Sequence, residues 1–222
     1  MIKHTTALAA GRFVGTIRAK RDTLQTLYYA SKNSYADAEA LRKKFSALPP
    51  LDPYAMPAPG QRDMGHAALR YAMTAAQATA EDSAVAFILI ADYWIRRLGK
   101  EGEGEIPDTR TIGGDAYNGV KLNEAVWALA NQARHLHDWE AKNAASPREQ
   151  GVFLSLNLPP LFHQAARMFL EKMSLPSYID FEDRLAQMAF DVLAGSPYRL
   201  DTASAGMVTI MMMGEPPPPA PA

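Results

Sequence analysis

The chain has 222 residues, of which 48% are hydrophobic, and its 23 basic and 24 acidic residues give a formal net charge of -1. This length is sufficient for a single domain with a sizeable core. A nearly neutral chain has no global field that would draw it to nucleic acid or to a membrane surface, so any contact with RNA must be local. The absence of cysteine excludes disulfides, thiolate metal sites and cysteine nucleophiles.

The sequence contains neither a secretory signal nor a membrane-spanning segment. Its first residues lack the apolar core of a signal peptide. The most apolar run, residues 84–90, is much shorter than the about 20 residues that are needed to cross a bilayer. We therefore expect a cytoplasmic protein with no membrane partner.

Two long helices are predicted in the first hundred residues. Over residues 12–48, apolar side chains recur every three or four positions without a proline, which predicts one continuous helix. The proline-rich residues 49–60 end it, because proline cannot continue a helix. A second helix is predicted over residues 61–98, and its many alanines indicate that another helix packs closely against it.

The centre of the chain is predicted to be a long helix over residues 118–143. Residues 100–119 precede it as a glycine-rich and acidic connection, which is interpreted either as a mobile loop or as a lid over the helix. Apolar residues fall on one side of this helix: Leu122, Ala125, Val126, Leu129, Ala133 and Leu136. The opposite side is polar and carries an indole: Glu124, Trp127, Asn131, Arg134, His135 and Asp138.

Three shorter helices are expected towards the C-terminus. Ser146 and Glu149 have the spacing of a capping box at the start of the first. The second is expected over residues 160–173, and the last is expected to begin with Asp180 as its cap.

The sequence therefore predicts an all-α fold, a bundle of about five to six helices that occupies residues 1–195. Residues 196–222 are predicted to be an extended or disordered tail. Within this tail, the apolar segment 206–214 is short enough to dock as a strand or an extended segment. The polyproline residues 216–222 are expected to be disordered.

The histidines do not form a pattern that is typical of metal sites. His135 and His137 lie one residue apart on a predicted helix, so their side chains point about 160° from each other and cannot share a metal. A serine nucleophile also lacks its usual elbow motif and strand framework. We predict no metal site and no cofactor.

Arg134 and His135 are the best candidates for chemistry. Arginine stays charged and can donate two parallel hydrogen bonds to a phosphate, while histidine can exchange a proton near neutral pH. Together these two groups have the chemistry to cleave a phosphodiester, with Asn131 holding a ribose hydroxyl or the imidazole and Trp127 stacking on a base. The alternative is a hydrogen-bonded cluster that fixes this helix to its neighbours or to a second subunit.

The string ANQARHLHDW at residues 130–139 resembles some members of the HEPN superfamily. The resemblance implies a bundle of four or five helices, commonly dimeric, and a metal-independent endoribonuclease activity. The family motif has an arginine, a polar residue and a histidine after a gap of four to six residues. Arg134 and His135 match its opening, but residues 139–141 contain no histidine. This departure leaves open a member that binds RNA, a nucleotide or a protein without catalysis.

The most specific prediction is a HEPN-like protein that binds or cleaves RNA through the polar face of the central helix. Arg134 and His135 are its predicted catalytic residues. The residues predicted to bind substrate or to form an interface are Glu124, Trp127, Asn131, Asp138 and Trp139. The alternative is a non-enzymatic interaction or dimerisation module, whose interface contains Trp127, Arg134 and Trp139. The expected partners are RNA, a second copy of the chain or another protein.

Overall fold

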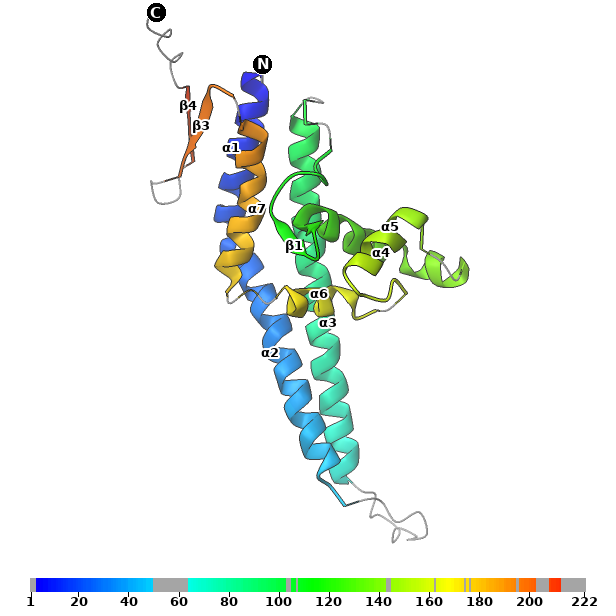
Figure 1. Cartoon of the computed structure of the whole chain (residues 1–222). Helices are drawn as coiled ribbons and strands as arrows, with labels where there is room; N and C mark the ends of the chain where they lie inside the picture. Colours follow the sequence, from blue (N-terminus) through cyan, green and yellow to red (C-terminus); the bar gives the residue numbers. More distant parts are fainter. Residues whose placement is uncertain are drawn as a thin grey trace, which may run out of the picture.

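A computed structural model of the chain describes residues 3–49, 64–102, 105–106, 108–142, 145–161, 163–173, 175, 177–194, 196–202 and 208–212. The helices are α1 (His4–Ala19), α2 (Arg21–Ser46), α3 (Met64–Glu101), α4 (Leu122–Lys142), α5 (Pro147–Ser155), α6 (Ala165–Lys172) and α7 (Tyr178–Leu193), and the strands are β1 (Asp115–Tyr117), β2 (Val120–Lys121), β3 (Tyr198–Asp201) and β4 (Thr209–Met212) (Figure 1). The predicted all-α fold is confirmed, because helices dominate and the strands form two small pairs. None of the described helices is both long and apolar enough to cross a membrane.

The first predicted helix is divided into α1 and α2. Lys20 has φ -105° and ψ 13°, which lies outside the helical region and ends α1. The break lets each helix bury its own apolar stripe: α1 packs against α3 and α7, while α2 runs along α3. The prediction of one continuous helix over residues 12–48 was therefore wrong. The spacing of apolar residues alone does not reveal a break that involves a single residue.

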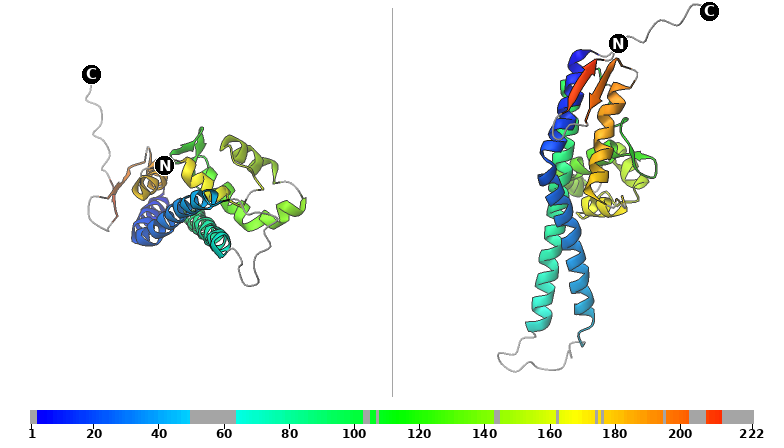
Figure 2. Two further views of the ribbon diagram at one scale, coloured as in Figure 1. Left: turned by 90° about the horizontal axis from the view of Figure 1, so that it is seen from below. Right: turned by 90° about the vertical axis from the view of Figure 1, so that its left-hand side faces the viewer.

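The two longest helices, α2 and α3, lie side by side and antiparallel (Figures 1 and 2). Tyr28 and Phe87 pack with ring centroids 5.9 Å apart, and Phe45 and His66 pack 5.4 Å apart at the other end of the pair. Residues 36–46 of α2 and 65–80 of α3 extend away from the remaining elements (Figure 2). We call these two segments the arm and the remaining elements the body.

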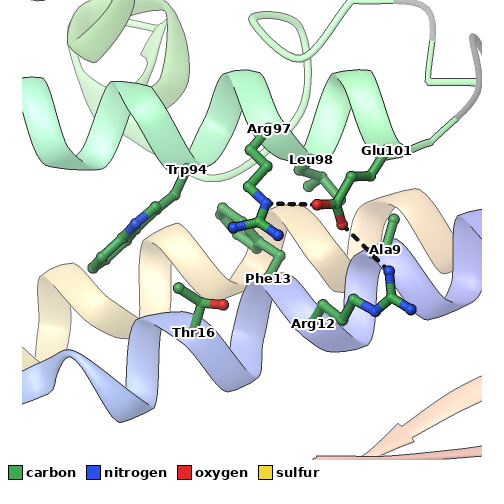
Figure 3. Close-up of a pocket in the computed structure, with 8 residues that line it drawn as sticks. All are labelled: Ala9, Arg12, Phe13, Thr16, Trp94, Arg97, Leu98 and Glu101. Carbon is green, nitrogen blue, oxygen red and sulfur yellow. Dashed lines mark hydrogen bonds and ion pairs between the residues drawn. The ribbon is translucent and has the colours of Figure 1, made fainter.

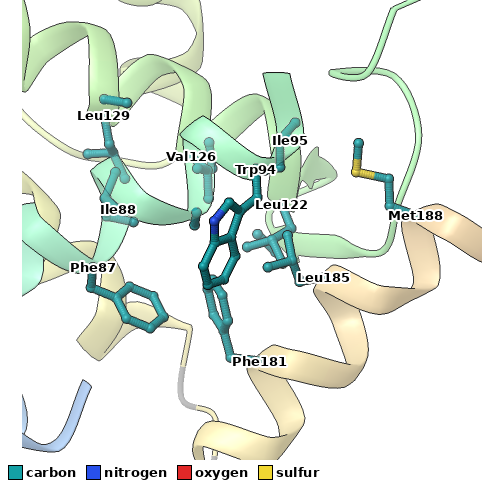
Figure 4. Packing of buried hydrophobic residues seen from close by; sticks show 14 of the residues in the cluster. Phe87, Ile88, Trp94, Ile95, Leu122, Val126, Leu129, Phe181, Leu185 and Met188 are labelled. Carbon is teal, nitrogen blue, oxygen red and sulfur yellow. The ribbon is translucent and has the colours of Figure 1, made fainter. Parts of the chain in front are cut away.

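The core of the body lies where α3, α4 and α7 meet (Figure 4). Phe87 of α3 and Phe181 of α7 are both fully buried, with ring centroids 4.6 Å apart in an edge-to-face arrangement. Trp94 lies beside them in the middle of the cluster (Figure 4). The buried apolar residues of α4 complete the layer: Leu122, Ala125, Val126, Ala128, Leu129 and Ala130.

A tight hairpin determines where α4 begins. Asn118 and Gly119 both have positive φ, 50° and 76°, and connect β1 to β2. Asn-Gly is the preferred pair for such a turn, because both residues tolerate this conformation. The helix that was predicted from residue 118 therefore begins at Leu122, whose amide donates to the Gly114 carbonyl at 2.9 Å.

The start of α7 differs from the prediction by three residues. Ser177 is its N-cap, and Asp180 is the third helical residue rather than the cap. The Asp180 carboxylate accepts hydrogen bonds from the Ser177 amide at 2.9 Å and the Ser177 hydroxyl at 2.7 Å. This reciprocal capping box satisfies backbone donors that the first turn of a helix leaves free.

The segment after α7 returns to the body as a hairpin. β3 pairs antiparallel with β4, and Leu200 lies opposite Ile210. Ile210 packs against α1 at Gly11, where a Cβ atom would lie only 2.9 Å from its Cδ1. The apolar segment predicted at residues 206–214 thus contains a docked strand at residues 209–212, whereas the polyproline residues 216–222 lie outside the described residues.

We predict that Phe87→Ala lowers the free energy of unfolding by about 3–5 kcal/mol, because it removes a fully buried ring and leaves a cavity. The matched change is Phe190→Ala, at a ring that is 40% exposed, which should cost less than about 1 kcal/mol. Urea denaturation measures both. Equal losses for the two variants would contradict the placement of the core.

Candidate functional site

A polar cleft of about 340 Å³ lies between α3, α4 and the connection that precedes β1. Pockets of this size accommodate small ligands or parts of larger ones. Its lining residues are Asp92, Ile95, Arg96, Gly99, Ile106, Asp108, Thr109, Arg110 and Trp127. The cleft therefore combines charged groups from α3 and the connection with the indole of α4.

A buried carboxylate, Asp92, forms one wall of the cleft. Only 1% of its surface is exposed. Its Oδ2 accepts a hydrogen bond from Nε of Arg96 at 2.7 Å and another from Nη2 of Arg134 in α4. A buried charge needs such partners, so this group ties α3 to α4 and fixes both guanidinium groups.

Asn131 extends this network to α5. Its Oδ1 accepts from Nη2 of Arg96 at 2.9 Å, and its Nδ2 donates to Oε1 of Glu149 at 3.1 Å. Glu149 is buried, and among the described residues its Oε2 has no hydrogen-bond partner. The capping box predicted for Glu149 was wrong, because Ser146 makes no side-chain cap and the carboxylate turns towards α4.

A second cluster of arginines surrounds Asp108. Nε and Nη2 of Arg110 donate to its two oxygens at 2.7 and 2.6 Å, and Nη2 of Arg148 lies 3.6 Å from Oδ2. Both guanidinium groups also lie over the Trp127 ring, with their central carbons 4.9 and 5.1 Å from its centroid. Cation–π contacts therefore occupy the ring that was predicted to stack on a base.

The arginines of this cluster change the acidity of Asp108. The side-chain hydrogen bonds from Arg110 lower the pKa of this carboxyl from 3.8 to about 2, and the charge of Arg148 acts in the same direction. In return, Asp108 raises the pKa of Arg110. Asp108 and Arg110 therefore both stay ionised at neutral pH.

The structure directs the two predicted catalytic side chains to different partners. Arg134 points to Asp92, whereas Nδ1 of His135 lies 3.6 Å from Asp138 Oδ2, and the side chains of His135 and Asp138 are exposed. Successive residues of a helix point about 100° apart, so the side chains of Arg134 and His135 leave the helix in different directions. Arg134 and Asn131 thus contact Asp92 and Arg96 of the cleft wall, whereas His135 and Asp138 lie outside the cleft.

Trp139 is a correction to the predicted binding residues. It is 8% exposed, and its ring packs perpendicular to that of Phe153 with centroids 6.4 Å apart. Position 139 follows the buried Ala125 by about four helical turns, so it returns to the buried side. Trp139 belongs to the core between α4 and α5.

Several residues of the site were not identified from the sequence. Arg96 is one of them, although its spacing of four residues from Asp92 is typical of an ion pair on a helix. In the sequence, nothing marks Asp108 and Arg110 as site residues except that they lie close together in a loop. Arg148 is distant from them in the sequence and comes near Asp108 only when the chain folds. Glu124, which was predicted, lies near enough to Arg110 to raise its pKa.

A crevice between α1 and α3 is a weaker candidate (Figure 3). Its volume of about 20 Å³ corresponds to about one water molecule. Glu101 closes one end of it through ion pairs with Arg97 at 2.5 Å and Arg12 at 3.9 Å. Of these pairs, only that of Arg12 joins α1 to α3, and the small volume leaves no room for a ligand.

Comparisons of the chain with family models, with curated proteins and with solved structures find no match. The interpretation of the cleft therefore rests on the geometry of its own residues. The HEPN resemblance of residues 130–139 remains a prediction from the sequence.

We predict that Arg110→Ala raises the pKa of Asp108 from about 2 towards 3.8, because the hydrogen bonds that stabilise the carboxylate are lost. A lowered pKa stabilises the fold above pH 3.8, and this contribution is lost as the pH falls towards 2. The stability difference between the native chain and the variant should thus be largest near neutral pH and should vanish below about pH 2. Carboxyl ¹³C NMR titration and urea denaturation at each pH measure the two effects, and an unchanged Asp108 titration would contradict the assignment.

Proposed function

We propose that the polar cleft binds a phosphate-bearing ligand, and that this ligand is RNA, which the protein holds without cleaving. The observation that carries the proposal is that each of the two aspartates lining the cleft, Asp92 and Asp108, is shared by two arginines. Asp92 is shared by Arg96 and Arg134. Asp108 is shared by Arg110 and Arg148. Each group of three thus has an excess of one positive charge.

Arginine is suited to this role because a guanidinium has five N–H donors in a plane and keeps some of them after pairing with one carboxylate. A phosphate can accept two of the remaining donors side by side. The carboxylates of Glu124 and Glu149 also act on Arg110 and formally offset the excess charge of the two groups, so binding depends on the directed N–H donors of the arginines. We therefore expect moderate affinity with a strong dependence on salt.

A second surface feature favours a polymer over a single nucleotide. Arg96 lines both the cleft and an adjoining open depression of about 470 Å³, whose other lining residues are Tyr93, Arg97, Lys100 and Glu101, the last of which pairs with Arg97. Tyr93 is 59% exposed and offers a ring on which a base can stack. A strand that leaves the cleft past Arg96 would meet cationic groups and an aromatic ring on the same side of α3.

The same geometry favours binding over catalysis. Cleavage without a metal needs a proton-transfer group close to the cation that neutralises the phosphate. In this chain Arg134 is held by the buried Asp92, and His135 pairs with Asp138 on the outer surface. The predicted pair of catalytic residues therefore does not converge on one point.

We predict that the native chain binds fluorescently labelled single-stranded RNA and that Arg96→Gln combined with Arg110→Gln weakens binding at least about tenfold, because two phosphate contacts are lost. Fluorescence anisotropy over a series of salt concentrations measures the affinity, and the salt dependence should also become shallower in the double variant. Arg42→Gln is the matched control, because Arg42 pairs with Glu39 on the arm and should leave binding unchanged.

The outcome that would contradict this proposal is equal affinity of the native chain and the double variant, or no RNA binding by either. Circular dichroism and thermal melting show whether the double variant is folded. The same RNA, incubated with the native chain and excess chelator, should remain intact. Cleavage that His135→Ala abolishes would overturn the non-catalytic part of the proposal and favour an endoribonuclease.

A further inference from the structure

One face of α3 is covered in the body and bare in the arm. Val85 borders a cavity that residues of α4 and α6 also line, and Leu89 packs against the buried core. Tyr71 precedes Leu89 by five helical turns, so it lies on the same side of α3. In the arm no described element covers this side, and Tyr71 is 79% exposed.

The arm has little buried apolar surface of its own. Among its described residues, Ala38 and Ala80 are the buried ones. Its larger apolar side chains are only partly buried between the two helices: Leu41, Phe45, Leu69 and Met73. Two helices alone cannot enclose a core, whereas four helices packed side by side can.

The bare face is also shaped for another helix. Small exposed side chains surround Tyr71 on it: Ala67, Ala68, Thr74, Ala75 and Ala78. They allow the backbone of a second helix to approach closely, and Tyr71 supplies a large ring that is typical of interface centres.

The charges on α3 select the partner. Arg70 is exposed near the tip of the arm, where the central carbon of its guanidinium lies 5.6 Å from the Phe45 ring centroid, and Asp82 is exposed near the base of the arm. The two are twelve positions apart, or about 18 Å along the helix axis. A second arm that runs in the opposite direction would place Arg70 of each copy near Asp82 of the partner subunit, which is the complementarity that a twofold axis requires.

We propose that the exposed face of the arm, formed by residues 67–78 of α3, binds the same face of a second copy of the chain. The two arms cross antiparallel near Ala75 and form a four-helix bundle. In this arrangement Tyr71 of one copy packs beside Ala78 of the partner subunit, whose small side chain leaves room for the ring. This inference is independent of the proposed RNA binding, since the cleft and the arm share no residue.

The absence of cysteine permits a direct test. Ala75→Cys places a single thiol at the proposed crossing point, where the two copies approach within the distance of a disulfide. Ala36→Cys is the matched control, because Ala36 is also an exposed alanine of the arm but lies on α2, outside the proposed face of α3. Mild oxidation should convert most of the Ala75→Cys protein to a cross-linked dimer on a non-reducing gel, and little of the control.

Light scattering after size-exclusion chromatography gives the second measurement. The native chain should be a dimer, Ala75→Arg should be a monomer of unchanged helicity, and Arg70→Asp should dissociate more readily. Combining Arg70→Asp with Asp82→Arg should restore the dimer. A monomeric native chain, or equal cross-linking at positions 75 and 36, would overturn the inference, even if the monomer bound a different protein through its arm.

Discussion

The buried carboxylate of Asp92 is the constraint on which the rest of the cleft depends. A charge with 1% exposure is tolerated only where charged donors surround it, so Arg96 and Arg134 are held in place by the need to neutralise it. Asn131 then accepts a hydrogen bond from Arg96 and donates one to Glu149. One ionised group thereby sets the relative positions of α3, α4 and α5.

The connection before β1 is fixed by a comparable set of polar contacts. Nδ2 of Asn123 donates to the carbonyls of Thr109 and Ile112 at 2.9 and 2.5 Å, and the Gly113 amide donates to Asp191 at 2.8 Å. These bonds place Asp108 and Arg110 across the cleft from Asp92. Because the arginines are positioned when the chain folds, a bound phosphate would not have to order them, which favours binding.

The sequence alone predicts the helices better than it predicts the residues of the site. Periodicity identifies the helices, since each buries a stripe, and it correctly places Asn131 and Arg134 on the polar side of α4. Trp139 was misassigned because the period was not followed to the end of α4, where it returns to the buried side. Periodicity itself fails at Lys20, where one residue breaks a helix. Asp108 and Arg148 could not be found, because their contact joins segments forty positions apart in the chain.

α3 carries residues of both proposed binding surfaces, the cleft and the exposed face of the arm. Its C-terminal turns carry Asp92 and Arg96 at the cleft, and its N-terminal turns carry the bare face around Tyr71. A dimer formed through the arms would keep both clefts open, because the arm extends away from the body (Figure 2). The two copies together would then offer two arginine clefts to one long ligand.

The central claim is that the arginines of the cleft meet a phosphate-bearing ligand, and NMR of the arginine side chains tests it most directly. The Nε–Hε signals of Arg96 and Arg110 should move with saturation as a short single-stranded RNA is added, while that of Arg42 on the arm should stay in place. Signals at the cleft that do not move while RNA binds, or equal movement of all three, would contradict the claim.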